Sequence, residues 1–166
     1  HFMKGSRQRL MISYGLGDAG TGLAAAQLGF YLLPFFTCAA GLPVWIGGVL
    51  LMITKLWDAF NDPLIGWLSD HTQSKWGPRL PWMATAAVPL GISLAAIWWV
   101  PPGGIAEKTT YYILIVILLM TAYTSINLPY AALSTELTSI TSLRTRLNAA
   151  RFTGSIIASL SGLTAA

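Results

Sequence analysis

The sequence predicts an all-α integral membrane protein with about five transmembrane helices. Of the 166 residues, 54% are hydrophobic and only 10% are charged, and no charge falls in residues 19–53 or 88–104. Crossing a bilayer by helix takes about 20 apolar residues, so the chain has room for about five spans and little else. The same composition excludes a soluble globular enzyme, a disordered chain and a basic nucleic-acid-binding domain.

The first span is expected over residues 10–38, after a basic leader that holds Lys4, Arg7 and Arg9. A signal peptide has a similar start, but its apolar region is only about 7–15 residues long. Here the apolar stretch is longer and includes Asp18, so a retained helix is expected.

Turns and polar stretches set off the other spans. Glycine and proline at 40–43 follow the first span, and the Pro-Pro-Gly-Gly run at 101–104 ends the third. Polar stretches at 69–79 and 136–146 follow the second and fourth spans. The remaining expected spans cover residues 44–68, 81–100, 111–133 and 147–166. Residues 1–166 are expected to form a single transmembrane helical domain.

The basic residues of the predicted loops are divided unequally between the two sides of the membrane. The side that holds the N-terminus receives Lys4, Arg7, Arg9, Lys75, Arg79, Arg144 and Arg146. The opposite side receives only Lys108, in a short expected loop with Glu107. Because cytoplasmic loops carry the excess of lysine and arginine, the N-terminus is expected in the cytoplasm, with the protein in the cell (cytoplasmic) membrane.

Charges at bilayer depth usually face a cavity or a partner. The candidates are Asp18, Lys55, Asp58, Asp62 and Arg151. Lys55, Asp58 and Asp62 follow at spacings of three and four, so they share one stripe of a helix. Two carboxylates one turn apart in a low dielectric cannot both stay ionised without compensation. A cation, a proton or a salt bridge to Lys55 could each supply it, and oxygen ligands suit a hard cation such as sodium.

A structural alternative exists for this stripe. Lys55 and Asp58 could neutralise each other and hold two helices together. Asp62, one turn further along, is then left unexplained. The sequence alone keeps both interpretations open.

The fourth span carries a second polar stripe, in which Tyr123, Asn127 and Tyr130 follow at spacings of four and three. This face could hydrogen-bond a polar ligand. Hydroxyls inside a transmembrane helix also serve as contacts between helices, and this alternative applies to Thr121 and Ser125.

One apparent cofactor motif is rejected. Residues 15–20 match the dinucleotide-binding pattern G-x-G-x-x-G, but that pattern needs a βαβ unit and an acidic residue about 20 positions on. The next acidic residue is Asp58, and a membrane span lies between. Close approach of helices explains the small residues of the first span. No cofactor is expected.

The most distinctive motif is the W-D-A-x-x-D-P block at residues 57–63. Residues 14–18, residues 74–79, residues 128–130 after Asn127, and Arg151 accompany it. With these residues the chain resembles the glycoside–pentoside–hexuronide:cation symporters, a branch of the major facilitator superfamily. The resemblance covers nearly the whole chain but only the first five of the family's twelve helices.

The resemblance implies alternating access by two six-helix halves around a central site. It also implies a cation site at Asp58, Asn61, Asp62 and Thr124 that takes sodium or a proton. Sodium would be ligated by the two aspartates. Lys55, at a position that is basic in the family's best-known member, is the implied charge partner.

The implied substrate residues lie on the first, fourth and fifth helices. Tyr123 and Arg151 match positions near the sugar, and Asp18 is assigned to the same set. Gly22 and Asn127 stand where the family has acidic sugar-binding residues. Because both acidic residues are replaced, the resemblance does not extend to galactoside recognition. It still implies cation coupling.

The sequence therefore predicts a cation-coupled secondary symporter of a sugar or related small solute, represented by its N-terminal part, and not an enzyme. One alternative is a non-transporting membrane scaffold subunit of a larger complex. Another is a lysolipid-type carrier, because such carriers share the helix-two block. The expected partners are a small-molecule substrate, membrane lipid, and a missing C-terminal half or another membrane chain, without nucleic acid.

Overall fold

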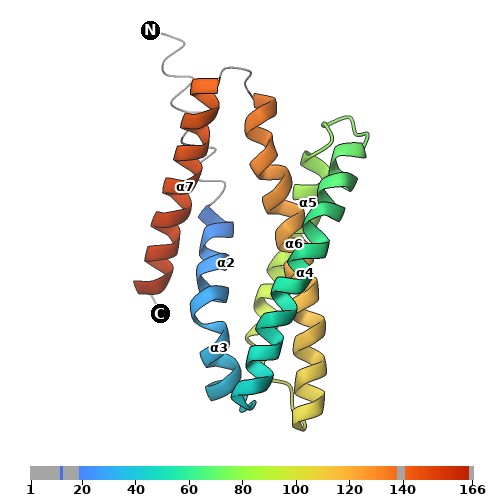
Figure 1. Ribbon diagram of the computed structural model, residues 1–166, viewed down its shortest axis with the longest axis vertical. Coiled ribbons are helices and arrows are strands. Elements are labelled where there is room, and N and C mark those ends of the chain that lie inside the picture. The colour runs from blue at the N-terminus through green and yellow to red at the C-terminus, as the bar shows by residue number, and fades with distance from the viewer. Residues whose placement is uncertain (1–11, 13–18, 138–140, 165–166) are drawn as a thin grey trace. The chain divides into compact units, whose positions relative to one another are not determined.

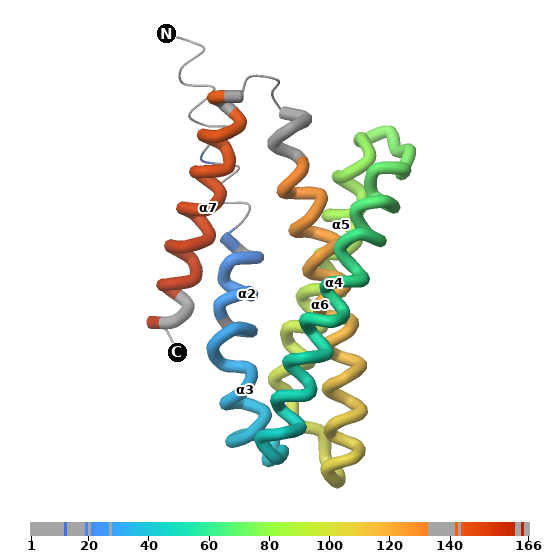
Figure 2. The backbone as a smooth tube through the Cα atoms, in the orientation of Figure 1, coloured from blue at the N-terminus to red at the C-terminus, as the bar shows by residue number. Residues whose placement is uncertain are grey.

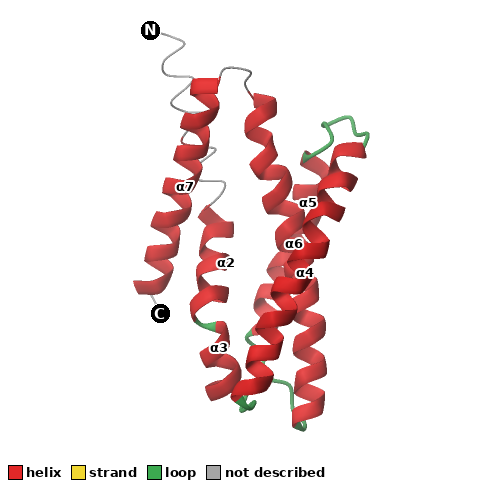
Figure 3. Cartoon of the chain, viewed as in Figure 1, coloured by secondary structure: helices red, strands yellow, loops and turns green. Residues whose placement is uncertain are grey.

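The computed structural model describes residues 12, 19–137 and 141–164, and every regular element in that part of the chain is helical (Figures 1 and 3). The elements are α2 (Ala19–Phe30), α3 (Leu32–Pro34), the π-helix η1 (Phe35–Ala39), α4 (Val44–His71), α5 (Leu80–Ile97), α6 (Ile105–Leu137) and α7 (Thr141–Thr164). The predicted all-α class is confirmed.

Two of the described helices are long and apolar enough to cross a membrane by length and composition. These are α5 over Leu80–Ile97 and α6 over Ile105–Ala132, and a third is reached if Thr21–Phe30 and Leu32–Ala39 count as one broken span. The other described helices do not meet these criteria, so a transmembrane role for α4 and α7 stays a prediction.

Two predicted loops are shorter in the structure. The helix α6 begins at Ile105, so Glu107 and Lys108 lie in its first turns, and their placement in a loop was wrong. An acidic side chain is favourable there because it faces the positive end of the helix dipole. The Glu107 side chain lies against Gly103, in the space that a side chain at position 103 would occupy. The helix α7 begins at Thr141, so Arg144 and Arg146 also lie in a helix.

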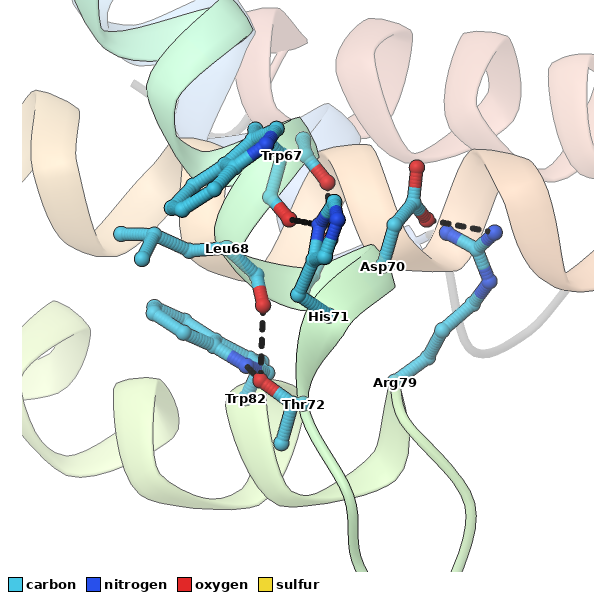
Figure 4. Close-up of polar contacts among 9 residues, drawn as sticks. Trp67, Leu68, Asp70, His71, Thr72, Arg79 and Trp82 are labelled. Atoms are coloured by element: carbon cyan, nitrogen blue, oxygen red, sulfur yellow. Dashed lines mark hydrogen bonds and ion pairs between the residues drawn. The ribbon is translucent and has the colours of Figure 1, made fainter.

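The connection between α4 and α5 is held by side-chain contacts (Figure 4). Arg79 forms an ion pair with Asp70 at 3.0 Å. The indole nitrogen of Trp82 donates to the hydroxyl of Thr72 at 2.7 Å, and that hydroxyl donates to the carbonyl of Leu68 at 2.8 Å. These contacts join the end of α4 to the start of α5.

The contacts of the chain divide it into two compact units, Tyr31–Tyr130 and a terminal unit made of His1–Phe30 with Ala131–Ala166. In the terminal unit α2 and α7 pack side by side (Figure 2). The approach is close at Gly22, where an added Cβ would lie 2.8 Å from the Cα of Ser155. Ser159 donates its hydroxyl to the carbonyl of Gly22 at 3.0 Å. The prediction of one domain over 1–166 stays a prediction.

The Tyr31–Tyr130 unit has an aromatic cluster in its core. Phe36 and Tyr112 are fully buried, with ring centroids 4.9 Å apart, and Phe35 packs edge-on to Trp98 at 5.0 Å. The hydroxyl of Tyr112 donates to the carbonyl of Trp99 at 3.0 Å, which satisfies its only polar atom. This cluster joins η1 to α6 and to Trp98, the residue that follows α5.

Candidate cation and substrate site

The two carboxylates of α4 lie one turn apart within a continuous helix, as their spacing predicts. Asp58 is half-buried, and its Oδ1 atom is buried without a hydrogen-bond partner. Asp62 is more exposed, and its Oδ1 accepts a hydrogen bond from the hydroxyl of Thr124 on α6 at 3.1 Å. Asp62 therefore has a hydrogen-bond donor for its Oδ1, whereas the buried Oδ1 of Asp58 has none.

A small cavity of about 80 Å³ lies beside these carboxylates, within the Tyr31–Tyr130 unit. It is lined by Asp58, Asp62, Tyr123, Thr124, Asn127 and Leu128. The structure thus brings together both aspartates of the predicted cation site, the Thr124 hydroxyl predicted for the same site on the fourth span (α6), and two predicted substrate residues. Leu128 is the one lining residue that sequence reasoning did not assign to the site.

The cavity presents carboxylate, hydroxyl and amide oxygens at one place. Hard cations prefer such oxygen ligands, and a carboxylate with an unsatisfied oxygen can equally take a proton. An unsatisfied acceptor in a buried place costs free energy, so either ligand would stabilise the site. Tyr123 and Asn127 supply further groups that can hydrogen-bond a polar solute.

Lys55 does not form an ion pair with either carboxylate, all three residues being in the described part of α4. Its side chain is exposed. The alternative in which Lys55 and Asp58 are permanently paired is therefore not seen in this structure. Lys55 as a charge partner of the site stays a prediction.

Asn61 faces α6 but does not line the cavity. It is buried, with 3% of its surface exposed, and its amide nitrogen donates to the carbonyl of Met120 at 3.5 Å. This bond uses one amide hydrogen and leaves the amide oxygen as an acceptor. Its assignment as a cation ligand stays a prediction.

The hydrogen bond between Trp57 and Thr121 was not predicted from the sequence. In the structure the indole nitrogen of Trp57 donates to the hydroxyl of Thr121 at 2.9 Å. The signal in the sequence was chemical: an indole N–H usually finds a partner when it is buried. Thr121 thus acts as a contact between helices, whereas Ser125 donates to the carbonyl of Thr121 in its own helix.

The other predicted substrate residues belong to the terminal unit. Asp18 lies outside the described residues. Gly22 is buried against α7, as given above. Arg151 is half-buried, and its guanidinium carbon lies 5.8 Å from the ring centroid of Phe152. The substrate roles of all three stay predictions.

Comparison with known proteins identifies the class of this chain. The model of a family described as MFS/sugar transport protein matches residues 13–166. An uncharacterized symporter of Synechocystis sp. is 44% identical over 158 residues, which cover 92% of this chain and 29% of that protein. The inner membrane symporter YicJ of Escherichia coli is 32% identical over 141 residues, covering 85% and 31%. The glucuronide carrier protein homolog of Escherichia coli is 32% identical over 144 residues, covering 86% and 32%.

These similarities define the class of the chain: it falls in a family of the major facilitator superfamily whose members are membrane transporters and not enzymes. The chain belongs to the MFS/sugar transport protein family. The resemblance drawn from the sequence is thereby confirmed at the level of the family. The chain spans about a third of the length of these relatives, 29–32%, and it matches their N-terminal portion.

Proposed function

We propose that this chain is the N-terminal part of a cation-coupled secondary symporter that moves a sugar or a related small polar solute. Asp58 and Asp62 take the coupling ion, sodium or a proton, with the Thr124 hydroxyl as a further oxygen. The substrate binds beside them, at Tyr123 and Asn127, and a C-terminal half completes the transport path. Arg151, Asp18 and Gly22 complete the proposed substrate residues.

The observation that carries this proposal is the unsatisfied Oδ1 of Asp58 next to a second carboxylate in a small polar cavity. A site that only joined two helices would satisfy its buried acceptors from within the protein. A coupling ion that enters and leaves must instead find an oxygen available to it. The proximity of the Thr124 hydroxyl to Asp62, 3.1 Å, supports its assignment as a further ligand of the same ion.

The choice of a sugar-like solute is supported by the chemistry of the cavity and by the relatives. Tyr123 and Asn127 offer hydrogen-bonding groups next to the carboxylates. One relative is named for a glucuronide, and the matching family model is described for sugar transport. The same proposal includes localisation in the cytoplasmic membrane with a cytoplasmic N-terminus, and the excess of basic residues on one side of the predicted spans supports this orientation.

The proposal is tested with the complete carrier reconstituted in sealed lipid vesicles. Sodium and proton gradients are imposed separately, and uptake is measured for labelled glycosides, pentosides and hexuronides and for lysophosphatidylcholine. Gradient-driven uptake of a sugar that is lost in Asp58→Asn and retained in the charge-matched control Glu107→Gln is the expected result. Uptake of the lysolipid alone would establish the lysolipid carrier instead. Absence of uptake for every solute under both gradients would favour the scaffold function and contradict the proposal.

A further inference from the structure

Two adjacent stripes of α4 face α6, and they differ in chemistry. The first holds Asp58 and Asp62, the carboxylates of the candidate site. The second holds Trp57 and Asn61, which are also one turn apart and which both bond to α6. The second stripe contributes nothing to the lining of the cavity, so it requires a separate explanation.

The bond between Trp57 and Thr121 links the two helices through groups whose N–H and O–H donors are both used. The indole has a single donor, and it is given to the Thr121 hydroxyl at 2.9 Å. That hydroxyl in turn donates to the carbonyl of Ile117 in its own helix at 2.8 Å. Because the bond is partly buried, water competes little for these groups, so the bond favours one rotation and one register of α4 against α6.

The position of this bond connects it to the cation site. Trp57 directly precedes Asp58, and Thr121 lies three residues before Thr124, on the same face of α6. A rotation or slip of α6 that broke the first contact would also move the Thr124 hydroxyl from Asp62, which it reaches at 3.1 Å. The contact between the helices continues at Gly66, where an added Cβ would meet Leu128 at 3.3 Å.

We propose that Trp57 is a positioning residue for the cation site, acting through its hydrogen bond to Thr121. The bond holds α4 against α6 so that the carboxylates of one helix face the Thr124 hydroxyl of the other. This inference rests on the proposed function, because it assigns Trp57 a role in cation binding. Trp57 does not itself touch the ion or the substrate.

Paired variants remove the bond from either end. Trp57→Phe keeps an aromatic ring and loses the N–H, and Thr121→Val keeps the side-chain shape and loses the acceptor. Each is expected to weaken cation affinity about 3- to 10-fold, the range that one net hydrogen bond allows. The double variant should bind the cation no more weakly than either single variant does, because each substitution removes the same hydrogen bond. Thr121→Ser keeps the hydroxyl and should restore near-normal affinity.

A matched control is available in the same unit. Trp82 donates its indole N–H to the Thr72 hydroxyl at 2.7 Å, at the junction of α4 and α5 and ten residues beyond Asp62 along the chain (Figure 4). Trp82→Phe removes a bond of the same kind and should leave cation affinity unchanged. A role in stability alone would give Trp57→Phe and Trp82→Phe the same effect on cation affinity.

The measurements use the complete purified carrier in detergent. Sodium affinity is measured by titration calorimetry, proton affinity by the pH midpoint of substrate binding, and folding by thermal unfolding. Weaker cation affinity in Trp57→Phe and Thr121→Val, with substrate affinity at saturating cation within about twofold of wild type, supports the proposal. Normal cation affinity in both variants overturns it while the proposed function stands. A wild-type carrier that responds to neither cation overturns the proposed function itself, and this inference with it.

Discussion

Replacing Gly22 by alanine adds one methyl group where α2 lies close to the backbone of α7. The added Cβ would lie 2.8 Å from the Cα of Ser155 and 2.9 Å from its carbonyl oxygen. Carbon atoms in good contact lie about 3.5–4.0 Å apart. The obstacle is backbone, which cannot turn away as a flexible side chain can, so the two helices must separate.

The magnitude follows from three contributions. Overpacking of a close contact costs about 1–3 kcal/mol. Separation also stretches the bond from Ser159 to the Gly22 carbonyl, 3.0 Å in the structure, and losing it costs about 1 kcal/mol. The higher helix propensity of alanine returns about 1 kcal/mol. Gly22→Ala is therefore expected to lower the free energy of unfolding by about 1–3 kcal/mol.

Gly29→Ala is the matched control on the same helix. An added Cβ at Gly29 meets nothing within 4 Å, so this variant gains helix propensity without a clash. Unfolding of the complete carrier in detergent, followed by circular dichroism against temperature or denaturant, compares the two. Gly22→Ala should unfold well before wild type, and Gly29→Ala at or above it. Equal midpoints for the two variants would refute the packing argument and favour a role for Gly22 in substrate binding alone.

Two further predictions concern orientation and substrate binding. In a carrier whose exposed Cys38 is replaced by serine, an impermeant thiol reagent added outside should label Glu107→Cys and spare Lys75→Cys, because the basic loops lie inside. The opposite pattern would mean that the topology is inverted. Arg151→Ala should abolish substrate binding, measured by equilibrium dialysis, in a protein that still unfolds cooperatively, and Arg151→Lys should restore little of it. Wild-type uptake by Arg151→Ala would show that the assignment on α7 is wrong.

The start of a helix was predicted correctly where one residue in the sequence determines it. α4 begins at Val44 as expected, because Pro43 directly precedes it and fits the entry to a helix. α6 begins six residues before the expected position 111, because a charged pair suggested a loop where the helix already starts. The break after Phe30 in the first expected span was also not predicted, although Pro34 removes a backbone donor there.

For the site, residues on one helix were easier to predict than contacts between helices. Spacing along α4 and α6 placed Asp58 with Asp62 and Tyr123 with Asn127, and the cavity contains all four. The bond from Trp57 to Thr121 depends on the rotation and register of two helices, which neither helix specifies by itself. The pairing of Lys55 with Asp58 was equally open in the sequence, since spacing permits it without requiring it.

The most direct test of the account is the sodium dependence of substrate uptake across pH, measured for wild type and for Asp58→Asn, Asp62→Asn and the double variant. If Asp58 and Asp62 form one cation site, protons and sodium compete for the same oxygens, so apparent sodium affinity in wild type falls as pH drops. One competing proton lowers it by up to about tenfold per pH unit. Either single variant should lose sodium stimulation more than substrate binding, with Glu107→Gln as the control. Sodium stimulation that survives intact in the double variant would contradict the assignment of the cation site to these two residues.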